Sequence, residues 1–109
     1  MEKVEVRFTY EDYLHMPEDK RYELIEGEFK MVPSPSYWHQ TVLKRLFRVL
    51  DDFVTTQGIG EVNFAPLDVV LSEENVLQPD ILFISKGRSG IITEKNIQGA
   101  PGLVVEIIS

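Results

Sequence analysis

The sequence lacks cysteine, long apolar runs and an excess of positive charge. Without cysteine there are no disulfides, thiolate metal sites or cysteine nucleophiles, and a reducing cytoplasm fits that absence. No apolar run approaches the roughly 18 residues that a membrane span needs, and the N-terminal residues 1–5 do not resemble a signal peptide. We therefore expect a cytoplasmic protein with no membrane partner.

Negative charge dominates, with 18 Asp and Glu against 11 Lys and Arg and a net charge of −7. An acidic surface repels phosphate backbones, so composition gives no support to nonspecific nucleic-acid binding. Carboxylates are also the side chains that attract metal cations. The composition alone leaves both interpretations open.

The chain has enough apolar material for one globular domain, which we expect to span residues 1–109. Its 109 residues are 43% hydrophobic and 27% charged, as in ordinary globular proteins. Periodicity and turn residues predict an α/β fold, of the α+β type with a mixed sheet. The expected elements are a short helix over 9–16, a β-hairpin over 21–32, a long helix over 37–55, and strands over 61–71, 76–84 and 103–108.

The last predicted strand, residues 103–108, is almost wholly apolar, which is typical of a central strand buried on both faces. Only one long helix is available to cover such a strand. We therefore expect either a truncated chain or cover from a second subunit, and a homodimer follows from the latter.

Two acidic residues stand beside or within apolar strands. Glu106 interrupts the last strand, where an unpaired carboxylate would cost several kcal/mol, and Asp80 precedes the apolar run 81–84. Two carboxylates on adjacent strands can hold a hard cation such as Mg²⁺, or Mn²⁺, with waters completing the shell. Such an ion activates water and stabilises the charge of a phosphodiester transition state.

Five segments in order resemble the Uma2 (DUF820) family of the PD-(D/E)XK nuclease superfamily. The resemblance covers nearly the whole chain, and the segments are specific as a set rather than singly. They are Tyr22–Glu28, Pro33–Ser36 with His39, Ala65–Val69, Gln78–Ile81 and Pro101–Ser109.

The resemblance implies a restriction-endonuclease-like core of order α-β-β-β-α-β. Asp80 and Glu106 match the two acids of the family motif and would be metal ligands, with the backbone carbonyl of Ile107 as a third contact. Glu23 matches a glutamate near the site, and His39 matches a recurring helix histidine. DNA is the implied partner.

The sequence departs from the superfamily pattern at the lysine two residues after the second acid, because this position is Ile108. In the family a lysine of the following helix takes its place. The chain ends before that helix, so we expect the final helix and strand of the core to be missing, together with the lysine.

Structural roles compete with the functional ones. Glu23 can equally be a solvent-facing hairpin residue, and His39 a neutral histidine that closes the apolar stripe of the long helix. We expect Asp68 to be an exposed strand acid. Lys44, Arg45 and Arg48 have the spacing of a solvated helix face.

Two functions follow from these observations. The first is an Mg²⁺-dependent endonuclease that hydrolyses DNA phosphodiester bonds, with Asp80, Glu106, Glu23 and His39 at the site. The alternative is a non-catalytic remnant, or a dimerising interaction module, on the same fold. The sequence does not distinguish DNA from RNA as the substrate.

Overall fold

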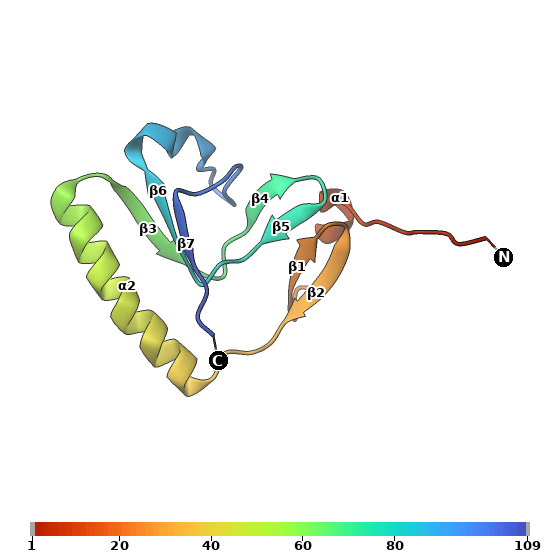
Figure 1. Ribbon diagram of the computed structural model, residues 1–109, viewed down its shortest axis with the longest axis horizontal. Helices are drawn as coiled ribbons and strands as arrows, with labels where there is room; N and C mark the ends of the chain where they lie inside the picture. The colour runs from red at the N-terminus through yellow and green to blue at the C-terminus, as the bar shows by residue number, and fades with distance from the viewer. Residues whose placement is uncertain (1, 109) are drawn as a thin grey trace.

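The computed structural model describes residues 2–108 and shows two antiparallel sheets and one long helix (Figure 1). A four-stranded sheet has the order β2-β1-β5-β4, and a three-stranded sheet has the order β3-β6-β7. The predicted α+β class is confirmed. The elements are α1 (Tyr10–Tyr13), β1 (Arg21–Ile25), β2 (Glu28–Val32), α2 (Tyr37–Gln57), β3 (Gly60–Phe64), β4 (Val69–Ser72), β5 (Asn75–Leu77), β6 (Ile81–Ser85), the 3₁₀ helix η1 (Lys86–Ile91) and β7 (Leu103–Val105).

The N-terminal half follows its local signals closely. Thr9 caps α1 in a capping box with Asp12, although the helix ends at Tyr13 and is shorter than predicted. The β1–β2 hairpin turns at Glu26 and Gly27, whose φ angles are 49° and 79°. Positive φ at both central residues is the hairpin geometry that matches the twist of the strands, and it favours glycine at the second position.

The long helix α2 begins and ends where the sequence places its capping residues. The side chain of Ser36 accepts a hydrogen bond from the backbone N–H of His39, and Gly58 ends the helix in the left-handed conformation. Val54 is buried in a cluster with Val62 and Ile81 of the three-stranded sheet, and Leu43, Leu46, Phe47 and Leu50 of α2 pack against this cluster. Val42, Val49 and Phe53 stay exposed, so not every apolar residue of α2 contributes to the core.

Each of the two long strands predicted in the middle of the chain is in fact two short strands in different sheets. Residues 65–68 separate β3 from β4, and residues 78–80 separate β5 from β6. Pro66 and Pro79 lie in these two breaks, and a proline cannot donate a ladder hydrogen bond. The chain therefore crosses twice between the sheets, and Asp80 lies at the second crossing.

The centre of the three-stranded sheet is β6, and both of its faces are buried. Leu82 and Ile84 pack with Val69 and Ile97 on one side, and Ile81 packs with Val54 and Val62 beneath α2 on the other. The sequence predicted a central strand at the C-terminus, but in the structure the central strand is β6.

The predicted central strand 103–108 is wrong in both length and place. β7 covers only Leu103–Val105 and lies at the edge of its sheet, with Leu103 and Val104 about half exposed. Apolar composition alone did not distinguish a twice-paired strand from a once-paired one, because pairing depends on the neighbouring strand and not on the segment itself.

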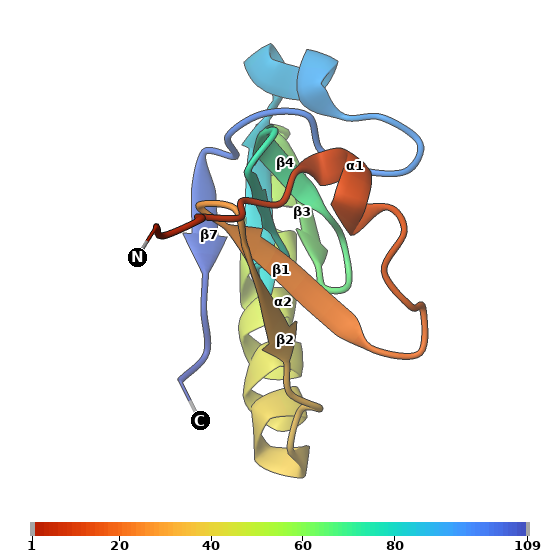
Figure 2. The same cartoon turned by 90° about the vertical axis from the view of Figure 1, so that its right-hand side faces the viewer.

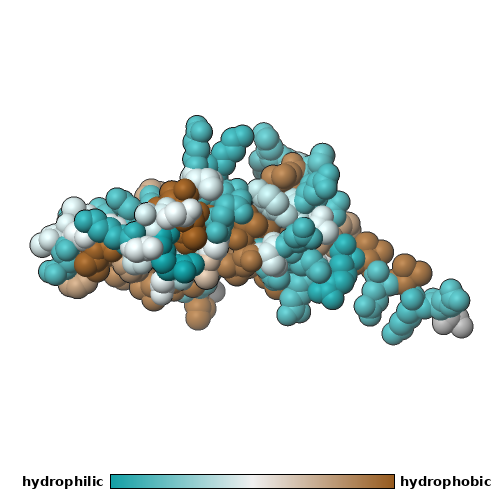
Figure 3. Space-filling view, turned by 90° about the horizontal axis from the view of Figure 1, so that it is seen from above, coloured by the Kyte–Doolittle hydropathy of each residue, from teal (hydrophilic) through white to brown (hydrophobic). Residues whose placement is uncertain are grey.

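Figure 1 shows α2 along one side of the three-stranded sheet and the β1–β2 hairpin on the other side. In Figure 2 the hairpin lies in front of the molecule and α2 lies behind the strands. Hydrophobic residues reach the surface between hydrophilic ones (Figure 3). Among residues 2–108, no helix is both long enough and apolar enough to cross a bilayer.

Candidate functional site

The site lies where β6 begins and β7 ends. These strands are antiparallel and end with the pair Ile81 and Val105, so Asp80 and Glu106 follow directly beyond this pair. The backbone N–H of Ile107 donates to Asp80, and the charge of Asp80 acts on Glu106, so the two acids are neighbours. The structure thus brings together the two acids that the sequence analysis selected.

Both carboxylate oxygens of Asp80 have a protein partner. The backbone N–H of Ile107 donates to Oδ2 at 2.7 Å. Nε2 of His39 lies 3.2 Å from Oδ1, and the two side chains are only 13% and 15% exposed. Among residues 2–108, Nδ1 of His39 is buried without a hydrogen-bond partner. Within this part of the chain the ring is held through Nε2, and the first turn of α2 directs it at Asp80.

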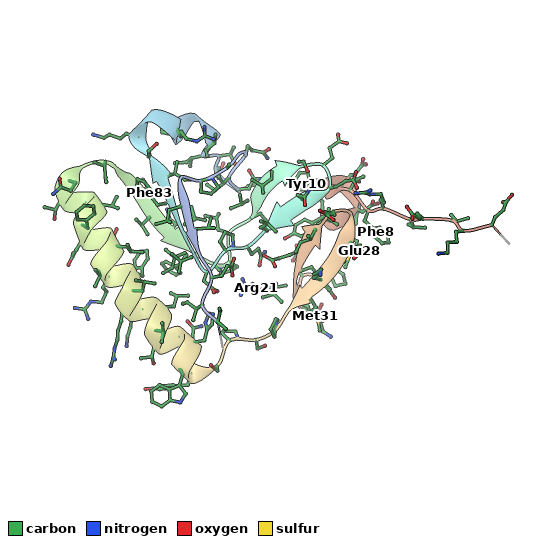
Figure 4. All side chains as sticks on the ribbon, in the orientation of Figure 1. Phe8, Tyr10, Arg21, Glu28, Met31 and Phe83 are labelled. Carbon is green, nitrogen blue, oxygen red and sulfur yellow. The ribbon has the colours of Figure 1, made fainter. Side chains whose placement is uncertain are left out.

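Glu106 has a raised pKa, first because of partial burial and then because of the nearby carboxylates of Asp80 and Glu23. His39 and Arg21 oppose the rise. Arg21 extends from the start of β1 toward the C-terminal segment (Figure 4). Three carboxylates from β1, β6 and β7 thus share one region, and their charges disfavour one another in the absence of a cation.

Glu23 does not face solvent. Its Oε2 accepts a hydrogen bond of 2.7 Å from the backbone N–H of Gln78, which joins the hairpin to the segment before Asp80. Of the two roles considered for Glu23, the exposed hairpin residue is therefore wrong.

Gln78 is the centre of a polar network that the sequence did not reveal. Its Oε1 accepts from Nε of Arg21 at 2.8 Å, and its Nε2 donates to Oδ1 of Asp68 at 2.8 Å. The hydroxyl of Tyr13 donates to the same oxygen of Asp68 at 2.6 Å. Asp68 is thus a half-buried network member rather than an exposed strand acid. The Gln-Pro-Asp segment was the only sequence signal for this network, and nothing marked Arg21 or Tyr13.

We predict that Tyr13→Phe lowers the free energy of unfolding by about 1–2 kcal/mol at neutral pH, because Asp68 and Gln78 lose a partner. Partial burial and Asp68 raise the pKa of Tyr13 far above its ordinary value. The unfolded chain ionises this tyrosine near pH 10. The stability it contributes is therefore present below about pH 10 and is lost as pH rises further.

Urea unfolding of wild type and Tyr13→Phe at pH 7.5 and 10.5 measures this effect, and the gap should narrow at the higher pH. Tyr37→Phe is the control, because Tyr37 is 75% exposed. An equal gap at both pH values would contradict the assignment.

A cavity of about 390 Å³ opens beside the acids, between α2, the end of β3 and the start of β1. His39 and Asp80 line it together with Lys44 and Arg48, whereas Arg45 does not. Of the three cations that were predicted to form a solvated helix face, Lys44 and Arg48 thus face the candidate site, and Arg45 lies outside the cavity wall.

The donors at this site fit a hard divalent cation as a two-carboxylate centre. Among residues 2–108, no three His, Cys, Asp or Glu side chains are grouped closely enough to hold an ion by themselves. Mg²⁺ commonly takes one or two carboxylates and keeps several waters. The neighbouring carboxylates of Asp80 and Glu106 meet that requirement, and the pKa of Glu106 is raised first by burial and then by the negative charge of Asp80 and Glu23, which a cation would neutralise. The carbonyl of Ile107 remains a predicted ligand, while its N–H orients Asp80.

Comparison with known proteins places the chain in a family. The family Uma2, described as "Putative restriction endonuclease", matches residues 10–109. A crystal structure of a "putative nuclease belonging to DUF820" from Anabaena variabilis aligns with a TM-score of 0.76 at 24% identity. The alignment covers 94% of this chain and 59% of that one, so the chain spans about three-fifths of that protein's length. No curated protein matches the sequence. The match over nearly its whole length shows that this chain belongs to the Uma2 family.

Proposed function

We propose that this chain is a nuclease domain that hydrolyses DNA phosphodiester bonds with the help of Mg²⁺ or Mn²⁺. The observation that carries the proposal is the proximity of Asp80, just before β6, to Glu106, just after β7, whose carboxylates repel each other beside a cavity with a cationic wall. Membership of a family described as restriction endonucleases supports the reaction class.

Asp80 and Glu106 would hold the cation, which would supply an activated water and stabilise charge at phosphorus. Ile107 and His39 fix the orientation of the Asp80 carboxylate through its two oxygens. Glu23 adds negative charge to the same region and ties the hairpin to it. Removal of a hydrogen bond that orients a metal ligand commonly lowers metal affinity or activity by 10–100-fold.

Arg21 supplies positive charge next to these carboxylates. It interacts electrostatically with Glu106 and is held by Gln78 through its Nε atom. A guanidinium fixed in this way can bind a phosphate oxygen without losing much conformational freedom. Its charge acts on Glu106, so it can take the role of the lysine that the superfamily pattern has at the position of Ile108.

The test is nicking of supercoiled plasmid by the 109-residue chain with Mg²⁺ or Mn²⁺ and with EDTA. Glu106→Gln should lower the metal-dependent rate by about 100-fold or more. The same substitution should raise the melting temperature without metal by about 1–3 °C, because it removes one of the repelling carboxylates. Glu94→Gln, at an exposed loop position, is the matched control.

Nicking that is unaffected by EDTA, or that persists in Glu106→Gln, would contradict the proposal. The homodimer and the cytoplasmic location remain predictions from the sequence.

A further inference from the structure

The cavity next to Asp80 differs in charge from the rest of the molecule. Its wall includes three cations, Arg21, Lys44 and Arg48, against one acid, Asp80, in a chain with a net charge of −7. An anionic ligand would be repelled by most of the surface and attracted to this wall.

Lys44 and Arg48 form the part of that wall contributed by α2. They are four residues apart on one helix, so their side chains are neighbours and their like charges repel. Among the residues that the structure describes, neither has a carboxylate within ion-pair distance. Two adjacent, unneutralised cations beside a cavity are suited to a phosphate group.

An aromatic surface completes the cavity. Phe64, at the end of β3, is 50% exposed and lines the wall. Its ring meets that of Phe47 edge to face, with centroids 4.9 Å apart, which fixes its orientation. A fixed and exposed ring is the usual platform on which an unpaired nucleic-acid base stacks.

We propose that this cavity binds one unpaired nucleotide of a polynucleotide strand, next to the bond to be cut. Lys44 and Arg48 bind its phosphate, and Phe64 stacks on its base. The assignment rests on the proposed nuclease function and narrows it to strands with an unstacked base, because a base inside a duplex cannot reach Phe64. A volume of about 390 Å³ is of the size that small-molecule sites have, which suits a nucleotide.

The test measures binding separately from cleavage, by fluorescence anisotropy of a labelled single-stranded 12-mer in EDTA. The double variant Lys44→Gln/Arg48→Gln should weaken binding at least 10-fold and lower the salt dependence of log K by about 1.4, from two lost phosphate contacts on a single strand. Arg45→Gln is the control, because Arg45 lies on the same helix outside the cavity wall; it should change both quantities much less.

Phe64→Leu tests the base contact. Wild type should bind the 12-mer about 5- to 100-fold more tightly than an abasic oligonucleotide of equal length, and Phe64→Leu should remove most of that preference. The same measurement with a 12-mer RNA distinguishes the two kinds of strand, and with a blunt duplex it tests the need for an unpaired base.

The two proposals fail in different ways. Tight binding that depends on Lys44, Arg48 and Phe64, without metal-dependent cleavage of either the plasmid or the single-stranded 12-mer, would remove the nuclease function and leave the cavity assignment. Metal-dependent nicking together with unchanged binding in the variants would remove the cavity assignment alone. Absence of binding by wild type, equal affinity for the abasic strand, or an equal loss in Arg45→Gln would each overturn it.

Discussion

Asp80→Asn is expected to abolish metal-dependent nicking, with a loss of at least about 100-fold and little change in thermal stability. Asparagine keeps the shape of the side chain and one acceptor oxygen, so the N–H of Ile107 keeps its partner. The substitution removes the negative charge that would bind the cation. It leaves a single acceptor where Asp80 now serves both Ile107 and His39, but it also removes a charge that repels Glu106, so the two effects on stability oppose each other.

Two measurements separate loss of the ion from loss of the fold. Calorimetric titration of Mn²⁺ should give heat with wild type and none with Asp80→Asn, and melting curves of the two proteins without metal should nearly coincide. Asp52→Asn, at an exposed position on α2, is the control for removal of one carboxylate. Equal Mn²⁺ heats in wild type and Asp80→Asn would end the ligand assignment.

Leu82→Ala should cause the largest loss of stability, about 3 kcal/mol, with a fall in melting temperature of at least about 10 °C. Leu82 is completely buried on β6, the central strand of its sheet, and packs with Val69, Ile84 and Ile97. Through Val69, this cluster connects β6 of the three-stranded sheet to β4 of the four-stranded sheet. A cavity there removes apolar contacts from both sheets at once.

Leu71→Ala is the matched control, because Leu71 is 45% exposed on β4 and its truncation leaves no cavity. We expect it to cost less than about 1 kcal/mol. Urea unfolding monitored through Trp38 and through the helical signal of α2 measures both variants. A similar cost at the two positions would show that β6 is not the centre of the core.

The first turn of α2 connects local sequence to the site. Ser36 caps the helix through the N–H of His39, which fixes where the first turn begins. That start directs the ring of His39 at Asp80, and the following turns place Lys44 and Arg48 on the cavity wall. One capping residue therefore sets the positions of an orienting group and of two candidate phosphate contacts.

The Uma2 match and the geometry support each other but answer different questions. The family assignment concerns the reaction class, and the structural likeness at 24% identity concerns the fold alone. The neighbouring carboxylates of Asp80 and Glu106 and the cations of the cavity wall are found in this chain itself. The substitutions proposed above therefore test the roles of these residues directly, whatever the family does.

The sequence by itself determined the elements whose signals are local. The hairpin turn at Glu26 and Gly27, the Ser36 cap and the Gly58 end of α2 each depend on a few neighbouring residues, so the hairpin over 21–32 and the helix from residue 37 were predicted close to their observed bounds. Asp80 and Glu106 were also identified from the sequence, because a carboxylate buried beside an apolar strand costs free energy unless it is paired or binds a cation.

Only the tertiary structure decided which strands pair and what surrounds the acids. The breaks at residues 65–68 and 78–80 send each long apolar segment into two sheets, and β6 rather than β7 becomes the central strand. Strand partners, the Gln78 network and the cavity on α2 all join residues far apart in the chain. No local pattern encodes such contacts, because their free energy depends on which surfaces meet after the chain has folded.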